Sequence, residues 1–257
     1  MQAPQRQRLV WLSPGTWDGL LAERRSSAAA GGAPDAVTIA CLDHWARHDL
    51  PLVVTRQARI DLPGRVDPAA DLAADLHDGS AAAGRADPAL ALGLPAPACW
   101  ERRRLALRVP ASGVVRVGDF PLAEAIAPLL SAPARVAWLD LCAGLEALGV
   151  VARVYGSLGW QQLTGLHYRH AGSDLDLLLA VRTPGQADLA AAWLDAAADP
   201  VWSVGLPQRD GELIFCDGAP EAWREWAGWR AGHTPRLLVK RRHGAALETG
   251  AIWADGP

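Results

Sequence analysis

The feature that most constrains the fold is an amphipathic segment at residues 134–148 that runs directly into a β-rich segment at residues 150–155. The apolar residues of the first segment recur at every third position, and Gly149 follows where a helix cap favours glycine. These apolar residues are Val136, Leu139, Cys142, Leu145 and Leu148. The next segment is rich in β-formers and ends at Gly156-Ser157. The order predicted here is a helix, a strand and then Gly-Ser.

Further strands and a helix are predicted downstream. Apolar runs of strand length occupy residues 176–181, 212–215 and 236–240. Residues 187–197 are rich in alanine and compatible with a helix, and Thr183-Pro184-Gly185 separates them from the preceding strand. Residues 119–257 are therefore predicted to form one α+β domain.

The first half, residues 1–118, is predicted to be a small mixed domain. Strands are expected at residues 8–12, 52–56 and 104–109, with a helix at residues 39–49. Ser13-Pro14-Gly15 has the composition of a turn, and residues 26–34 that of a flexible loop. Residues 61–88 show no periodicity. We interpret residues 20–35 and 61–90 as insertions.

Charge, apolar content and cysteine spacing exclude several classes of protein. The formal net charge is −3 and the basic residues are scattered, which does not favour nucleic-acid binding. No segment has the length of a membrane span and no signal peptide is evident, so a cytoplasmic protein is expected. The four cysteines form no Cys-x-x-Cys pair, which predicts buried thiols rather than a zinc site or a disulfide framework.

Ser173-Asp174-Leu175-Asp176 is the motif that points most directly to chemistry. Side chains alternate along a strand, so Asp174 and Asp176 are expected on one face. Two neighbouring carboxylates repel each other unless a cation lies between them, and Mg²⁺ prefers such oxygen ligands. Mg²⁺ also takes phosphate oxygens from its substrate, which points to a triphosphate. A solvated loop is the alternative reading of an isolated Asp-x-Asp.

Several other residues are candidates for the same site. Gly156-Ser157 offers a close backbone approach and a hydroxyl for phosphate binding. Glu212, at the start of a strand, is the preferred third metal ligand, whereas Asp217 lies in a Cys-Asp-Gly turn. Trp160 and Lys240 are candidate substrate contacts, although a lysine at a strand end is usually only solvated.

Weaker signals are interpreted in ordinary structural terms. Cys41, His44 and His48 share helical spacing but lack a fourth ligand, so a solvated face is preferred to a metal site. The tryptophans at spacing three after residue 222 are expected to pack in the core. The remaining candidates for phosphate contact lie around the motif, the histidines being more typical of a surface: Arg153, His167, Arg169 and His170.

The arrangement of Gly156-Ser157, the Asp174-x-Asp176 pair and an acid on a later strand resembles the nucleotidyltransferase fold of the DNA polymerase beta superfamily. The segments 155–166 and 173–178 more closely resemble the phosphoribosyl-dephospho-CoA transferases of malonate decarboxylase, also called holo-acyl-carrier-protein synthases. Shorter matching segments extend the resemblance over most of the chain: Leu9–Leu12, Pro51–Val54, Gly93–Pro95, Asp210–Glu212, Trp223–Glu225 and Leu238–Lys240.

The resemblance implies a small N-terminal domain at residues 1–118 and a polymerase-beta-like palm domain at residues 119–257. It also implies transfer of the phosphoribosyl-dephospho-CoA group from 2'-(5''-triphosphoribosyl)-3'-dephospho-CoA to a serine of the apo acyl-carrier subunit, with release of diphosphate. Asp174 and Asp176 would be the catalytic, Mg²⁺-binding residues. The alternatives are a nucleotidyltransferase with another hydroxyl acceptor, and a catalytically silent module that only binds a carrier protein.

Overall fold

A computed structural model describes residues 7–29, 35–57, 87–197, 206–215, 219–220, 223–241 and 244–249. Cys216, Asp217 and most of the predicted insertion at residues 61–90 lie outside these ranges. None of the described helices is both long enough and apolar enough to cross a membrane. Helices and strands are mixed throughout, which confirms the predicted α+β class.

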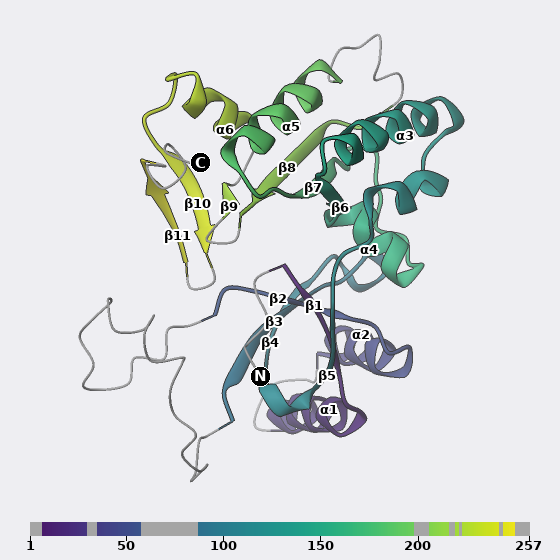
Figure 1. The fold of residues 1–257 in the computed structure, drawn as a ribbon. Helices are drawn as coiled ribbons and strands as arrows, with labels where there is room; N and C mark the ends of the chain where they lie inside the picture. The colour runs from purple at the N-terminus through teal and green to yellow at the C-terminus, as the bar shows by residue number, and fades with distance from the viewer. Residues whose placement is uncertain are drawn as a thin grey trace, which may run out of the picture.

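The first half of the chain forms a five-stranded antiparallel sheet in the order β4-β3-β2-β1-β5, and two helices cover one of its faces (Figure 1). A buried cluster joins alternate residues of these strands to both helices. The elements are β1 (Leu9–Leu12), α1 (Pro14–Ala29), α2 (Ala36–Arg47), β2 (Leu52–Val54), β3 (Ala89–Pro95), β4 (Arg104–Pro110) and β5 (Val114–Gly118), with short 3₁₀ helices at Ala98–Trp100 and Ala111–Gly113.

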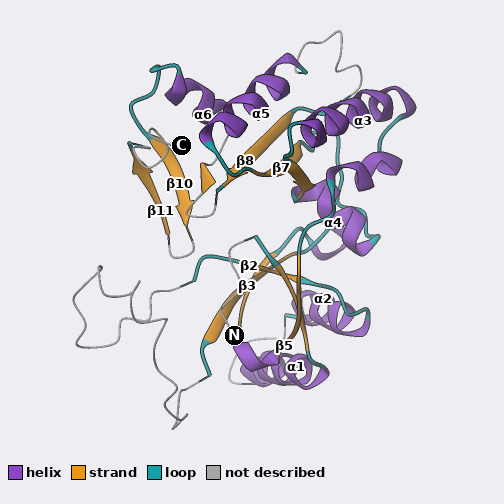
Figure 2. Ribbon diagram, viewed as in Figure 1, coloured by secondary structure: helices purple, strands orange, loops and turns teal. Residues whose placement is uncertain are grey.

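The second half contains a three-stranded sheet in the order β6-β7-β8, with β6 antiparallel and β8 parallel to β7. A second small antiparallel sheet, β11-β10-β9, lies beyond β8 (Figure 2). The elements are the 3₁₀ helix Ala123–Leu129 (η4), α3 (Ala132–Ala147), β6 (Val151–Val154), α4 (Gly156–Thr164), β7 (Leu175–Ala180), α5 (Pro184–Ala196), β8 (Arg209–Ile214), β9 (Ala219–Pro220), α6 (Trp223–Arg230), β10 (Leu237–Arg241) and β11 (Gly244–Glu248).

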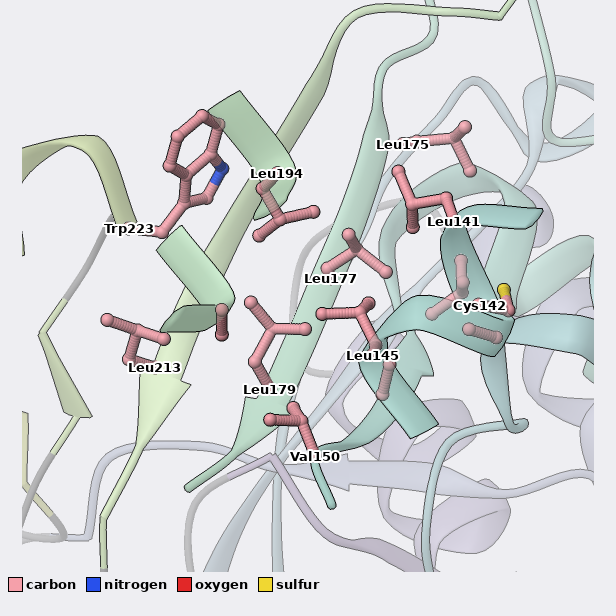
Figure 3. Close-up of a cluster of buried hydrophobic side chains, with 14 of the residues drawn as sticks. Leu141, Cys142, Leu145, Val150, Leu175, Leu177, Leu179, Leu194, Leu213 and Trp223 are labelled. Carbon is pink, nitrogen blue, oxygen red and sulfur yellow. The ribbon is translucent and has the colours of Figure 1, made fainter. Parts of the chain in front are cut away.

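Helix α3 is correctly predicted, but the face that it buries is not. Val136 and Leu139 are 63 % and 43 % exposed. A spacing of three drifts around a helix that has 3.6 residues per turn, so the buried stripe follows spacings of three and four instead. That stripe consists of Ala134, Trp138, Leu141, Cys142 and Leu145. It packs against Leu175, Leu177 and Leu179 of β7 (Figure 3).

Other local predictions need correction. Ser13-Pro14-Gly15 starts helix α1 rather than a turn, because proline suits a first helical turn and the Ser13 hydroxyl accepts a bond from Thr16 N. The helix continues to Ala29, through part of the predicted insertion at residues 20–35. Strands β3, β5 and β11 and helix α4 were not predicted. Cys41 and Cys142 are buried as expected, whereas Cys99 is exposed.

The two halves meet on the face of the first sheet that helices α1 and α2 leave free. Leu9, Phe120, Trp160 and Leu178 form a buried cluster there, with residues from both halves around it. The connecting segment is also held by charge, since Asp119 pairs with Arg8 at 2.8 Å and with Arg153 at 3.5 Å. The second half is thereby fixed against the first sheet.

Close packing of α3 against α5 predicts that Gly144→Ala destabilises the protein. A Cβ at this position would lie 2.2 Å from the indole of Trp193, whose Nε1 donates to Leu141 O. We expect the free energy of unfolding to fall by about 1–3 kcal/mol, measured by denaturant titration. Gly19→Ala is the matched control, because Gly19 is an exposed position of helix α1 and a Cβ there meets nothing within 4 Å. It should raise stability by about 0.5–1 kcal/mol. Equal effects of the two changes would contradict this packing.

Candidate functional site

The Asp-x-Asp motif lies where the chain enters β7. Leu175, Leu177 and Leu179 point into the core beneath α3 and α5, so Asp176 and Leu178 face the opposite way. Asp174 precedes the strand and is exposed, while Asp176 is half-buried. The aspartates therefore lie on the same side of the sheet as the cluster that joins the two halves.

The parallel pairing of β7 with β8 brings further carboxylates to this face. Asp176 is opposite Asp210, and Leu178 is opposite Glu212. Burial raises the pKa of Asp176 to about 6, and the negative charges of Asp174, Asp210 and Glu212 add to that rise. The face is an acidic site, defined here as Asp174, Asp176 and Asp210 with Glu212 beside them.

Glu212, the predicted third metal ligand, makes a strong contact elsewhere. Its carboxylate is almost wholly buried and lies 2.5 Å from Nζ of Lys240 on β10. This lysine is the only one in the sequence. Asp210 is exposed, and its side chain accepts a bond from Gly211 N. The metal-binding role of Glu212 stays a prediction, but these contacts favour Asp210 as the third carboxylate.

Asp210 was not predicted as a site residue, because it does not adjoin the apolar residues 213–215 that marked Glu212 as the start of a strand. It shares a strand face with Glu212 and lies two residues earlier. Its position opposite Asp176 depends on the parallel register of β7 and β8, which no local pattern specifies. The alternation along Asp210-Gly211-Glu212 was the available signal.

Gly156 opens helix α4 directly against the acidic site. Its φ is +59°, and a Cβ there would lie 1.8 Å from Oδ2 of Asp176. The preceding residue is fixed as well, because Tyr155 N donates to Asp176 O at 2.9 Å. Ser157 follows in the first turn of the helix. A helix N-terminus beside these carboxylates offers free N–H groups and a favourable dipole to an incoming phosphate.

The other predicted contacts lie around the site rather than in it. Trp160 is only 4 % exposed and packs between Phe120 and Tyr168, so the structure gives its ring a packing role, and its substrate contact stays a prediction. Arg153 donates to Phe120 O and pairs with Asp119. Arg169 donates to Leu129 O. His167 and His170 are exposed, as expected for surface residues.

The acidic site fits a magnesium ion that a substrate helps to bind. Its donors are hard carboxylate oxygens, and the pKa of Asp176 is raised first by burial and then by the negative charges of the neighbouring carboxylates, which a bound cation would offset. Within the described residues, no three Asp, Glu, His or Cys side chains converge closely enough to hold a metal ion by themselves. The remaining ligands would therefore be water and phosphate oxygens, as is usual for Mg²⁺.

A glycine-opened helix N-terminus beside carboxylates is suited to binding a phosphate group together with a divalent cation. Comparison with protein families makes the assignment specific. Residues 121–251 match the family model described as the phosphoribosyl-dephospho-CoA transferase MdcG C-terminal domain, and residues 79–120 match the corresponding N-terminal domain. The chain belongs to the phosphoribosyl-dephospho-CoA transferase family.

Individual relatives agree with this assignment. A phosphoribosyl-dephospho-CoA transferase of Xanthomonas campestris pv. campestris (strain 8004) is 32% identical over 94% of this chain and 92% of its own length. One from Bradyrhizobium diazoefficiens is 34% identical over 92% of this chain and 86% of its own. No solved structure matches the chain. The family predicted from the sequence is confirmed, and the protein is a transferase.

Gly156→Ala is expected to abolish transferase activity. The added Cβ would overlap the Asp176 carboxylate, and the positive φ would add about 1–2 kcal/mol of backbone strain. Gly165→Ala is the matched control, because Gly165 has a φ of +71° but a Cβ there meets nothing within 4 Å. Both variants should lose stability through the positive φ, and Gly156→Ala should lose more because its Cβ also overlaps Asp176, but only Gly156→Ala should be inactive. Full activity in Gly156→Ala would show that the reaction does not need the Asp176 carboxylate in this position.

The raised pKa of Asp176 predicts that stability falls as pH rises from about 4 to about 6. In this window the folded protein keeps a proton that the unfolded chain has released, so rising pH favours unfolding. Asp176→Asn removes this dependence. Its thermal midpoint should exceed that of the unsubstituted chain at about pH 8, and the two should converge near pH 4. A difference that does not vary with pH would show that Asp176 titrates normally.

Proposed function

We propose that the protein transfers the phosphoribosyl-dephospho-CoA group of 2'-(5''-triphosphoribosyl)-3'-dephospho-CoA to a serine of the apo acyl-carrier subunit of malonate decarboxylase. The family assignment identifies phosphoribosyl-dephospho-CoA as the transferred group. The observation that carries the proposal is the register of Asp176 with Asp210, which gathers carboxylates beside the open N-terminus of α4. Such a site suits a triphosphate and has no evident use in a passive binding module.

In the proposed reaction the serine Oγ attacks the α-phosphorus of the 5''-triphosphate. A new P–O bond forms, the bond from the α-phosphorus to the bridging oxygen breaks, and diphosphate leaves with that electron pair. The serine proton passes to water. The product carries its prosthetic group through a phosphodiester. Little covalent help is needed from the protein, since positioning and charge neutralisation dominate phosphoryl transfer.

Asp174 and Asp176 would hold Mg²⁺ in this scheme, and Asp210, opposite Asp176 on β8, would join them only after the carboxylates draw together around the ion. The ion would neutralise phosphate charge and lower the pKa of the serine hydroxyl. Gly156 keeps the space in front of Asp176 open, and the first turn of α4 offers N–H groups to the phosphates. Glu212 is neutralised by Lys240, which leaves the negative charge of the face concentrated on the three aspartates.

The order of elements supports a nucleotidyltransferase palm for residues 119–257. Helix α3, strand β6, helix α4 with Gly156-Ser157, strand β7 with the aspartate pair, helix α5 and strand β8 with Asp210 follow one another. Another hydroxyl acceptor would use the same site, so the acceptor is the part of the proposal that needs direct measurement.

The test is transfer to the carrier, followed by intact mass. The purified chain, Mg²⁺, the triphosphoribosyl donor and apo carrier subunit should give a carrier heavier by the transferred group, together with diphosphate. Asp174→Asn and Asp176→Asn should each reduce the rate by at least about 100-fold, since they remove charge stabilisation used in the transition state. An unmodified carrier with the unsubstituted enzyme would refute this acceptor.

The comparison of Asp210→Asn with Glu212→Gln identifies the third carboxylate. Asp210→Asn should lower the rate and raise the Mg²⁺ concentration needed for half-maximal activity, with little loss of stability, because Asp210 is exposed. Glu212→Gln should mainly destabilise the fold, because it removes the charge of Glu212 from a buried ion pair with Lys240. The reverse pattern would restore Glu212 as the ligand.

A further inference from the structure

The loop between α4 and β7 carries Asp174, and among the described residues it is hydrogen-bonded to the first sheet through the side chain of Tyr168. The hydroxyl of Tyr168 donates a 2.8 Å bond to the backbone oxygen of Pro95, the last residue of β3. The Tyr168 ring stacks on Trp160, whose own ring meets Phe120 edge-on. Tyr168 thus joins a loop of the second half to the end of strand β3 in the first sheet.

The same loop is fixed to the second half on either side of Tyr168. Oε1 of Gln161 on α4 accepts bonds from the backbone N–H groups of Tyr168 and Arg169, at 3.3 and 3.1 Å. The buried Ser173 closes a tight turn, since its Oγ accepts from His170 N and its N–H donates to His170 O. These bonds fix the backbone between Tyr168 and Asp174, so that a shift of Tyr168 would also move Asp174.

Asp174 depends on that backbone because its carboxylate has no anchor of its own. Among the described residues, none donates a hydrogen bond or forms an ion pair with its side chain, and it is exposed. Mg²⁺ demands near-ideal octahedral geometry, and a displacement of about 1 Å at a reacting centre can cost about 100-fold in rate. A ligand without side-chain support must be positioned by the loop that bears it.

We propose that Tyr168 is a positioning residue, through which the first sheet holds the Asp174 loop in the geometry that transfer requires. The N-terminal half is then part of the catalytic apparatus, although it supplies no carboxylate to the acidic site. This inference rests on the proposed role of Asp174 in the reaction. A purely structural hydroxyl would instead add to stability and leave the rate unchanged.

The test compares Tyr168→Phe with Thr55→Val in the whole 257-residue chain. Tyr168→Phe removes only the hydroxyl and keeps the stacked ring. Thr55→Val also deletes a hydroxyl that donates to a backbone oxygen of the first sheet, Ala91 O at 3.1 Å, but far along the chain from the loop. The measurements are kcat, the KM for the donor, the thermal midpoint, and amide hydrogen exchange of residues 169–175.

We expect Tyr168→Phe to lower kcat by about tenfold or more with the donor KM within about twofold, the pattern of a lost transition-state interaction. Exchange of the loop amides should rise, while the thermal midpoint should fall no further than in Thr55→Val. Gln161→Ala, which releases the loop from α4, should reproduce the loss of kcat. An unchanged kcat in Tyr168→Phe, or equal losses in Thr55→Val, would overturn the inference.

A failure of the proposed function is distinguishable from a failure of this inference. If the unsubstituted chain transfers nothing to the carrier, the function fails, and binding of Mn²⁺ alone then tests the loop. Titration followed by electron paramagnetic resonance should give weaker Mn²⁺ binding for Tyr168→Phe than for Thr55→Val. Equal binding together with equal loop exchange would show that Tyr168 does not position Asp174.

Discussion

The crowding of carboxylates on one face of the β6-β7-β8 sheet is the constraint on which the rest of the structure depends. The register of β7 with β8 places Asp176 opposite Asp210, and burial then holds the pKa of Asp176 well above its ordinary value. Such a face is costly to maintain, and the apolar packing of α3 and α5 on the opposite face provides the compensating stability. The repulsion among these carboxylates is a cost that a bound cation would relieve.

Charge on this face is divided between two arrangements. Glu212 is neutralised within the protein by Lys240, which also ties the small β9–β11 sheet to the β6-β7-β8 sheet. The aspartates have no such partner among the described side chains. The buried Glu212–Lys240 pair therefore stabilises the fold, whereas the partly exposed aspartates beside it are available to bind a ligand.

Aromatic residues support the site by packing rather than by binding. Trp160 and Phe120 fill the junction of the two halves, while Trp223 and Trp226 are buried with the second core, as their spacing predicted. Polar contacts between described residues add specific geometry to this apolar junction. Tyr168 is one of these, and Asp119 with its two arginines is another.

The sequence by itself determined the α+β class, the family, helix α3, the strands β6 and β7, and a shared face for Asp174 and Asp176, because each depends on local periodicity or on a contiguous motif. A period of three misassigned Val136 and Leu139, since only the packed helix selects its buried stripe. The tertiary structure alone decided that Asp210 faces Asp176 and that Lys240 neutralises Glu212. Both contacts join segments about 30 residues apart, whose meeting is fixed by strand register and core packing rather than by any local pattern.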